Sequence, residues 1–362
     1  MSVASIDSRE KIAKIDVSNM LGSIEALGKQ IEHAWKDTRG IEFTPTAEIR
    51  NVVVAGMGGS ALGADVILHL FKEQLTVPLY VNRTYSLPNY VDEHTLVLLS
   101  SYSGTTEEVL TVAKIAQEKN AQIMVIASGG DLVELATQKN YPLYIIDPIH
   151  NPSDQPRMAI GYSVFGTIAL LAKAGIISLT DADVAAVVEV INQKVVECTV
   201  EVPSEANPAK TLAFLTIDRL PFFVVGDFLE GAAHVVANQH NENAKAFANF
   251  TVVPEMNHHL MEGLHFPLSN TSTHLFVFVQ SVLYDPKISI RIKLTQQIVE
   301  ENTIETTAIP LQSSSKLTQV FELITVFSFA GFYLSMLEGI DPSPIPTVDS
   351  FKEMLSREAQ DY

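Results

Sequence analysis

Five short runs of β-branched and aliphatic residues in the first half of the chain constrain its fold more than any other feature. The runs are continuous rather than alternating, as expected for strands buried on both faces of a sheet. They are NVVVAG from Asn51, PLYVN from Pro78, TLVLLS from Thr95, QIMVIAS from Gln122 and PLYIID from Pro142. Helical spacing follows at 61–73, 106–119, 131–139 and 162–175. This alternation predicts a parallel sheet with helices on both faces.

The second half of the chain repeats the pattern in a weaker form. It follows the turn-rich segment VPSEANPAK at 202–210. Strand-like runs lie at 221–227, 250–255, 274–280 and 305–312. We therefore predict an α/β protein with two parallel sheets, each flanked by helices. The boundary is expected near 180–205, and we place the domains at residues 1–180 and 181–362.

The chain is acidic, with 42 Asp and Glu against 24 Lys and Arg and a formal net charge of −18. A broad basic surface is not expected, which argues against nucleic acid or anionic lipid as a partner. The one cysteine, Cys198, has no partner for an internal disulfide. These features predict a cytoplasmic protein.

Two segments have only some features of a targeting or membrane sequence. The first 20 residues alternate charged and apolar side chains, which predicts an amphipathic helix rather than a signal peptide. Residues 321–337 are strongly apolar, but Glu322 and a length below the roughly 20 residues that span a bilayer favour a buried helix. No membrane anchor is expected.

The segment SSYSGTTEEV at 100–109 gathers hydroxyl side chains between the third apolar run and a helix. At the carboxyl end of a buried strand, the free N–H groups and positive dipole of the next helix favour an anion. Ser101 and Ser103 add donors without charge, and Gly104 lets backbone approach a ligand closely.

A simpler interpretation is that this segment only caps the helix. Thr105 or Thr106 would be the N-cap, and Glu107 or Glu108 would complete a capping box. Capping explains one or two hydroxyl groups, but it leaves Ser101 and Ser103 without a role.

A second unusual loop, GMGGSA, follows the first apolar run. Its glycines fit a loose dinucleotide fingerprint, which stays a minority possibility because the second run ends in Asn82 and Arg83 rather than an acidic ribose ligand. In a flavodoxin-like strand order of 2-1-3-4-5, strands one and three are neighbours, and ligands bind in the crevice between their loops. We therefore predict one phosphate site per chain, formed by Gly58, Gly59, Ser60, Ser101, Ser103 and Thr106.

Together these residues resemble the SIS-domain sugar isomerases, and among them the bifunctional phosphoglucose/phosphomannose isomerases. The similar motifs are GMGGSALGAD, SYSGTTEE, ASGGDL, QPRMAIGYS, NQHNENAK, PEMNHHLMEG and DPSPIPTVDSFK, from about residue 50 to 355. The resemblance implies two flavodoxin-like SIS domains. It also implies interconversion of glucose 6-phosphate and/or mannose 6-phosphate with fructose 6-phosphate, as in glycolysis and gluconeogenesis. The resemblance implies no metal or other cofactor. It does imply a homodimer with its active site near the subunit interface.

The resemblance also assigns catalytic residues. It implies Glu242 as the base, His258 and Lys352 in ring opening, and Arg157 beside the developing charge. These types suit the chemistry, because a buried carboxylate near neutrality can move a proton between adjacent carbons through a cis-enediolate. Histidine suits proton transfer to a ring oxygen, and a guanidinium can hold two oxygens.

The chain departs from the family pattern at three places. Thr105 stands where the family has Asn, and 235–237 lack the basic residues expected there. His259 replaces a common Asn, and spacing favours His258 over His259 as the acting imidazole. The segment HHLMEGLH lacks the His-Glu-x-x-His order, so zinc is not expected. The alternative function is a non-catalytic phosphosugar sensor, which would have no need of all four catalytic residues.

Overall fold

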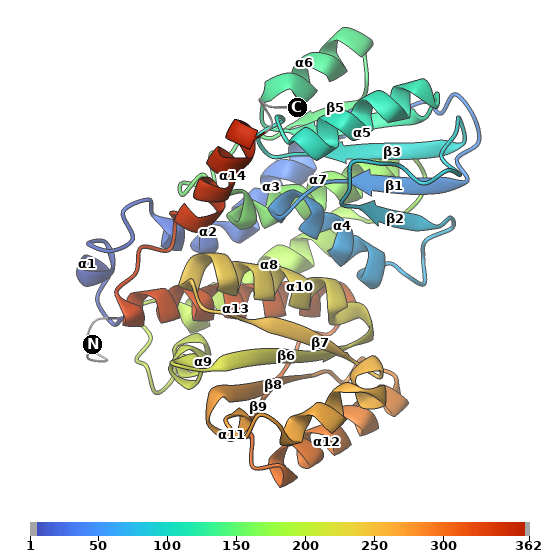
Figure 1. Cartoon of the computed structure of the whole chain (residues 1–362). Helices are drawn as coiled ribbons and strands as arrows, with labels where there is room; N and C mark the ends of the chain where they lie inside the picture. The colour runs from blue at the N-terminus through green and yellow to red at the C-terminus, as the bar shows by residue number, and fades with distance from the viewer. Residues whose placement is uncertain (1–5, 359–362) are drawn as a thin grey trace.

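The computed structural model describes residues 6–358, which form two parallel sheets separated by helices (Figure 1). The first sheet has the order β2-β1-β3-β4-β5, with every neighbouring pair parallel. Its strands are β1 (Asn51–Ala55), β2 (Leu79–Asn82), β3 (Thr95–Ser100), β4 (Gln122–Ala127) and β5 (Leu143–Ile145). The predicted strand order 2-1-3-4-5 is confirmed.

The second sheet has the order β7-β6-β8-β9 and is also parallel throughout. Its strands are β6 (Leu220–Gly226), β7 (Asn249–Val253), β8 (His274–Gln280) and β9 (Glu305–Pro310). Its first three strands, taken in chain order, are arranged as in the first sheet. Each sheet therefore has a switch point between its first and third strands, where neighbouring loops diverge.

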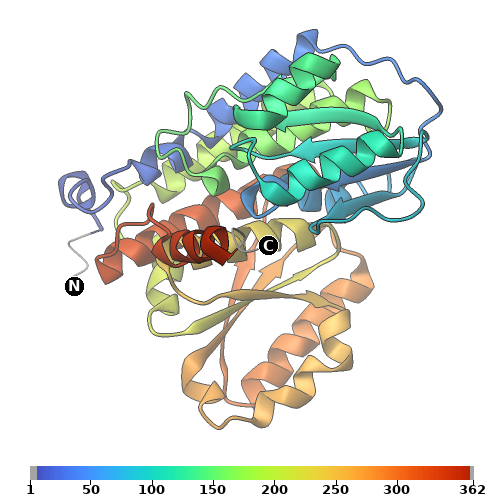
Figure 2. The ribbon, with the colours of Figure 1, turned by 45° about the horizontal axis from the view of Figure 1, so that its top comes forward.

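The helices form layers on both sides of each sheet (Figures 1 and 2). The outer face of the first sheet carries α5 (Glu107–Glu118) and α6 (Gly130–Lys139). The inner layers are α3 (Leu27–Asp37), α4 (Gly59–Leu70) and α7 (Ile160–Lys173) on the first sheet, and α8 (Asp181–Cys198), α10 (Glu230–Gln239) and α13 (Lys316–Glu338) on the second. The remaining helices of the second half are α9 (Pro208–Thr216), α11 (Asn270–Thr273), α12 (Pro286–Glu301) and α14 (Pro346–Glu358).

Two apolar cores follow from the double-sided sheets. Val53 and Ala55 of β1 pack into a core beneath α5 and α6, while Val52 and Val54 belong to a core that extends through the inner helices into the second half. Helix α8 packs on α3 of one half and on α13 of the other. The division of the chain at residue 180 stays a prediction.

Helix α13 explains the most apolar segment of the sequence. Within residues 6–358 it is the one helix long and apolar enough to cross a membrane, and its apolar window is entirely buried in the protein. The prediction of a buried helix is confirmed. The argument from length was wrong, because the helix has 23 residues.

The amino-terminal segment is not one amphipathic helix. Over the described part of the first 20 residues, the structure has α1 (Arg9–Ile12) and then the start of α2 (Met20–Glu25). Asn19 has a left-handed backbone (φ 57°), and its side chain accepts a hydrogen bond from the Gly22 N–H. This conformation starts α2 after a turn that follows the end of α1 at Ile12, and a periodicity argument does not detect such a cap.

The two halves meet where α10 lies against α4. A Cβ atom on Gly231 of α10 would lie 2.3 Å from the carbonyl oxygen of Asp65 of α4, so only glycine permits this approach. The Asp65 carboxylate also accepts from His234 Nδ1 of α10 at 2.8 Å and pairs with Arg83. These partners together lower the pKa of Asp65 although its burial acts in the opposite direction.

Candidate active site

The predicted phosphate loops lie at the carboxyl ends of β1 and β3. Ser101 Oγ and Thr106 Oγ1 lie 2.7 Å apart, and the N–H of Tyr102 donates to Ser60 Oγ at 2.9 Å. Ser60, Ser101 and Thr106 are therefore brought together. Ser103 is exposed at the rim of the same loop, where its Oγ accepts from the Thr105 N–H and hydroxyl.

The helices that open from these loops have no side-chain caps. Thr106 is the N-cap of α5, but its side chain makes no capping hydrogen bond. Gly58, at the N-cap of α4, has no side chain to offer. Thr106 is therefore the N-cap residue, as the capping interpretation expected, but its side-chain cap and the capping box do not form. Two helix N-termini are left with free N–H groups near the hydroxyl cluster, an arrangement that favours an anion.

The glycines of the two loops serve different purposes. Gly58 has φ +48°, and nothing lies within 4 Å of where its Cβ would be, so a ligand can approach there. A Cβ on Gly59 would lie 2.9 Å from the backbone nitrogen of Arg157. Gly104 has φ +71°, and its Cβ would lie 1.8 Å from the Gly129 carbonyl oxygen. The expected role of Gly104 in ligand approach was wrong, because contact with the β4–α6 turn requires this glycine.

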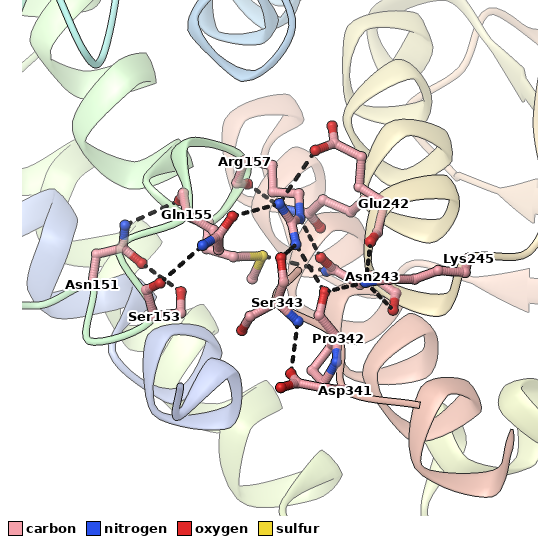
Figure 3. A network of polar contacts seen from close by, with 12 residues as sticks. Asn151, Ser153, Gln155, Arg157, Glu242, Asn243, Lys245, Asp341, Pro342 and Ser343 are labelled. Carbon is pink, nitrogen blue, oxygen red and sulfur yellow. Dashed lines mark hydrogen bonds and ion pairs between the residues drawn. The ribbon is translucent and has the colours of Figure 1, made fainter. Parts of the chain in front are cut away.

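Arg157 is buried beside the phosphate loops, with 1% of its side chain exposed, and all five of its N–H groups have acceptors (Figure 3). One Nη1 hydrogen bond reaches Glu242 Oε2 at 3.3 Å. The other acceptors are the Asn243 and Gln155 side chains and the carbonyls of Pro342 and Ser343. In this arrangement the guanidinium gives Glu242 a fixed positive neighbour rather than two free donors.

Glu242 lies on a π-helical turn, His240–Ala244, that follows α10. Burial raises the pKa of Glu242 above its ordinary value, and the charges of Arg157, Lys245 and Lys352 oppose this shift. Lys352 of α14 is therefore within electrostatic reach of the carboxylate although it is exposed. The structure brings Glu242 and Arg157 into contact, whereas Lys352 makes no hydrogen bond or ion pair with either of them in the described part of the chain.

His258 is not part of this group within one chain. It is exposed and lines a separate groove with Lys72, Glu230 and Arg291. No hydrogen bond or ion pair joins it to the other three predicted catalytic residues in the part of the chain that the structure describes. Its neighbour His259 is also exposed and lies 3.7 Å from Glu255.

Two further sequence expectations concern this half of the chain. Val235, Val236 and Ala237 are at most 3% exposed, so the positions where basic residues were expected belong to the buried face of α10. Across residues 6–358, no group of three His, Cys, Asp or Glu side chains is placed to hold a metal ion.

Sequence reasoning missed the residues that hold Arg157 and Glu242. Gln155, Asn243 and Lys245 contact this pair directly or through the turn on which Glu242 lies. Asn243 and Lys245 belong to the NENAK motif, which was the available signal. The carbonyl of Pro342 left no signal, because backbone acceptors have no residue preference.

Comparison with known proteins matches both halves of the chain. A profile described as SIS domain matches residues 47–172, and one described as bacterial phospho-glucose isomerase C-terminal SIS domain matches 205–355. A bifunctional phosphoglucose/phosphomannose isomerase from Caldicellulosiruptor bescii is 33% identical over 93% of this chain and 99% of that protein. The chain belongs to the bifunctional phosphoglucose/phosphomannose isomerase family.

A second member agrees with this assignment, and a solved structure shares the fold. The bifunctional phosphoglucose/phosphomannose isomerase of Aquifex aeolicus is 27% identical over 93% of this chain and 98% of that protein. A hypothetical protein from Thermus thermophilus shares the fold, with a TM-score of 0.75, 17% identity, and coverage of 99% of this chain and 94% of that one. In the present chain, α8 lies between the two segments that the family profiles match, 47–172 and 205–355.

Proposed function

We propose that the protein is an aldose-ketose isomerase that interconverts glucose 6-phosphate and/or mannose 6-phosphate with fructose 6-phosphate. The observation that carries the proposal is the position of Glu242. It is a carboxylate with a raised pKa, paired with a buried arginine whose backbone packs against the Gly59 loop. A sugar phosphate held at the hydroxyl loops would present its carbon chain toward this base.

The chemistry needs one base and no added redox agent. The Glu242 carboxylate removes the proton from C2 of the open-chain aldose, and the cis-enediolate forms with its negative charge on O1. The O2 hydroxyl proton passes to O1, which becomes the C1 hydroxyl oxygen, and the same carboxyl group returns its proton to C1 as O2 becomes the ketone oxygen. A raised pKa suits this exchange, because the group must both accept and donate near neutral pH.

The remaining residues support this step. Ser60, Ser101, Ser103 and Thr106, with the amides of Gly58 and Gly59, bind the phosphate. Arg157 supplies fixed positive charge beside the enediolate. Lys352 and His258 open the ring by moving protons at the ring oxygen and the anomeric hydroxyl. No metal or other cofactor takes part.

The site is completed across a homodimer, with His258 supplied by a second copy of the chain. Two observations support this arrangement: His258 is exposed and apart from Glu242 in one chain, and α14 exposes an apolar stripe. The stripe consists of Val348, Phe351, Met354 and Leu355. Exposed apolar surface of this kind is typical of subunit contacts.

The proposal also covers the location of the protein and its division into domains. The protein acts in the cytoplasm, in glycolysis and gluconeogenesis, which fits a chain whose one cysteine is free and buried. Residues 1–180 carry the phosphate site, and residues 181–362 carry the base and the terminal helices.

A coupled assay with each hexose 6-phosphate, with and without chelator, tests the function. We expect turnover that is insensitive to chelator, and a loss of about 10³-fold in kcat for Glu242→Gln with KM nearly unchanged. Glu134→Gln, on the exposed surface of α6, is the matched control. If the wild-type protein binds both sugars but turns over neither, the protein is a phosphosugar sensor instead.

Mixing two inactive variants tests the shared site. Equal amounts of Glu242→Gln and His258→Ala chains, after subunit exchange, should recover about a quarter of wild-type activity, since half of the dimers are mixed and each has one intact site. No recovery from a mixture shown to contain mixed dimers would place His258 and Glu242 in the same chain's site or outside it.

A further inference from the structure

Lys245 follows the π-helical turn that carries Glu242, and it has an unusual backbone. Its φ of 54° lies in the left-handed region that glycine adopts most easily. Its Nζ donates to the carbonyl oxygens of Glu242 at 2.8 Å and Pro342 at 2.6 Å, with Asn243 O at 3.5 Å. A lysine therefore stands where glycine would be less strained, and although the residue is exposed, its ammonium group donates to backbone carbonyls.

Arg157 reaches the same connection from the first half. Its Nη2 donates to the carbonyls of Pro342 at 2.8 Å and Ser343 at 2.9 Å (Figure 3). The Ser343 N–H in turn donates to Asp341 Oδ1 at 3.0 Å. Two cations thus meet at one carbonyl, that of Pro342, in the connection between α13 and α14.

Helix α14 depends on this connection for its position. None of its residues is buried, so little side-chain packing fixes it against the rest of the chain. Lys352 nevertheless acts on the charge of Glu242. The segment 341–345 is therefore the main covalent and hydrogen-bonded path that sets where Lys352 lies.

We propose that Lys245 is a positioning residue of the isomerase site, because its ammonium group joins the turn that carries Glu242 to the segment that carries Lys352. The inference rests on the proposed function for its kinetic consequences. Lys245 does not touch the reacting atoms in this arrangement. It holds the base and the ring-opening lysine at a fixed separation, on which proton transfer depends steeply.

The charge of Lys245 has a second effect on the base. Glu242 faces Arg157, Lys245 and Lys352, and all three lower its pKa against the effect of burial. Lys245 itself faces Arg157, Asp341 and Glu242, and burial lowers its pKa to about 8. Lys245 is therefore mostly charged at neutral pH, and its removal leaves Glu242 with one fewer cation and a higher pKa.

Replacement of Lys245 by Met keeps side-chain length and removes the charge and the donors. We expect kcat to fall about 10- to 100-fold with less than about a threefold change in KM, and the acid limb of kcat to move to higher pH. Lys316→Met is the matched control, because Lys316 pairs with Glu73 on the surface, and it should change neither quantity. A Lys245→Met enzyme with the kcat and acid limb of this control overturns the proposal.

Lys245→Arg covers the case in which the Met variant does not fold. Arginine keeps the charge and can donate to two carbonyls, so its acid limb should match that of the wild-type enzyme while kcat falls by less than in the Met variant. An acid limb displaced upward in the arginine variant overturns the proposal.

Hydrogen exchange separates this inference from the proposed function. Amides of residues 347–358 should exchange faster in Lys245→Met, or in Lys245→Arg where the Met variant does not fold, than in Lys316→Met. This result supports the connection even if the wild-type protein turns over no hexose phosphate, an outcome that would refute the function alone. Equal exchange rates in the variants of both lysines refute the connection.

Discussion

The two sheets have similar strand order, and the loops after β1 and β3 correspond in position to those after β6 and β8. The helices that follow β3 and β8 nevertheless begin differently. Helix α5 begins after Thr106, whose side chain makes no capping hydrogen bond. Helix α12 begins after Asp285, whose carboxylate accepts from the Lys287 N–H at 2.8 Å. The carboxylate of Asp285 occupies the cap position of α12, whereas no side chain caps the amide groups of α5, although Glu107 and Glu108 lie in its first turn. The shared topology gives each sheet a possible anion site at a helix N-terminus. The residue at the N-cap decides whether that site is already filled by a side chain.

The serines that follow the third strand of each sheet differ in the same way. Ser101 follows β3 and contacts Thr106 and the Gly104 N–H, within the hydroxyl loop. Ser281 follows β8, and its hydroxyl donates to Gln319 of α13 at 2.6 Å. The Ser101 hydroxyl, although only 1% of the residue is exposed, bonds within the hydroxyl loop, whereas the Ser281 hydroxyl ties its loop to the core. This contrast supports the prediction of a single phosphate site.

Thr106→Asp should produce the largest effect, because it places at the N-cap of α5 the same residue type that caps α12. A carboxylate at the N-cap of α5 would repel the substrate phosphate, and we expect kcat/KM to fall at least about 10³-fold. Stability should rise by about 0.5–1 kcal/mol through the new cap. Steady-state kinetics and urea unfolding measure the two effects. Thr106→Ser is the control, and a Thr106→Asp enzyme of normal kcat/KM would contradict the phosphate site.

Ser101→Ala should raise KM about 10- to 100-fold and change kcat much less, because a hydrogen bond to a charged phosphate is lost. Ser281→Ala, at the matching position of the other sheet, should leave KM unchanged and lower the free energy of unfolding by about 1–2 kcal/mol. Michaelis–Menten kinetics and denaturant unfolding of both variants test the contrast. Equal KM values for the two variants would contradict the proposal that only the loop after β3 binds the phosphate.

The pH profile separates the contributions of the two halves. Burial raises the pKa of Glu242, and the base must be ionised to act, so kcat should fall about tenfold per pH unit below a limb that lies above the ordinary 4.5. Ser101→Ala should leave this limb in place, since it changes only phosphate binding. Saturating kcat measured from about pH 4 to 9 gives the limb. A limb at or below 4.5 would argue against Glu242, a half-buried carboxylate, as the base.

Asp285→Ala should have the smallest effect. It removes the carboxylate cap of α12 and should lower the free energy of unfolding by about 1 kcal/mol, with kinetic constants unchanged within about twofold. Chemical denaturation followed by circular dichroism provides the measurement. A large rise in KM would show that the loop after β8 also serves the substrate.

The sequence predicted the sheets well because a buried parallel strand is encoded locally. Each apolar run from NVVVAG to ETTAIP became a strand, within a residue or two at the ends. Local signals failed where one residue changes the backbone direction, as at Asn19, or where a neighbour distant in sequence decides. Gly104 is required by Gly129, and the guanidinium of Arg157 is held by groups up to 186 positions away. The family motifs located Glu242, but no local pattern revealed what surrounds it.

The contact at Gly231 limits how the enzyme can respond to its substrate. Backbone touches backbone where α10 crosses α4, and such a contact does not slide or open without losing many neighbours at once. Sugar capture should therefore proceed with little hinge motion, and crystals grown with and without sugar phosphate should superimpose across both halves. Any adjustment during the catalytic cycle is then confined to the lightly held terminal helix.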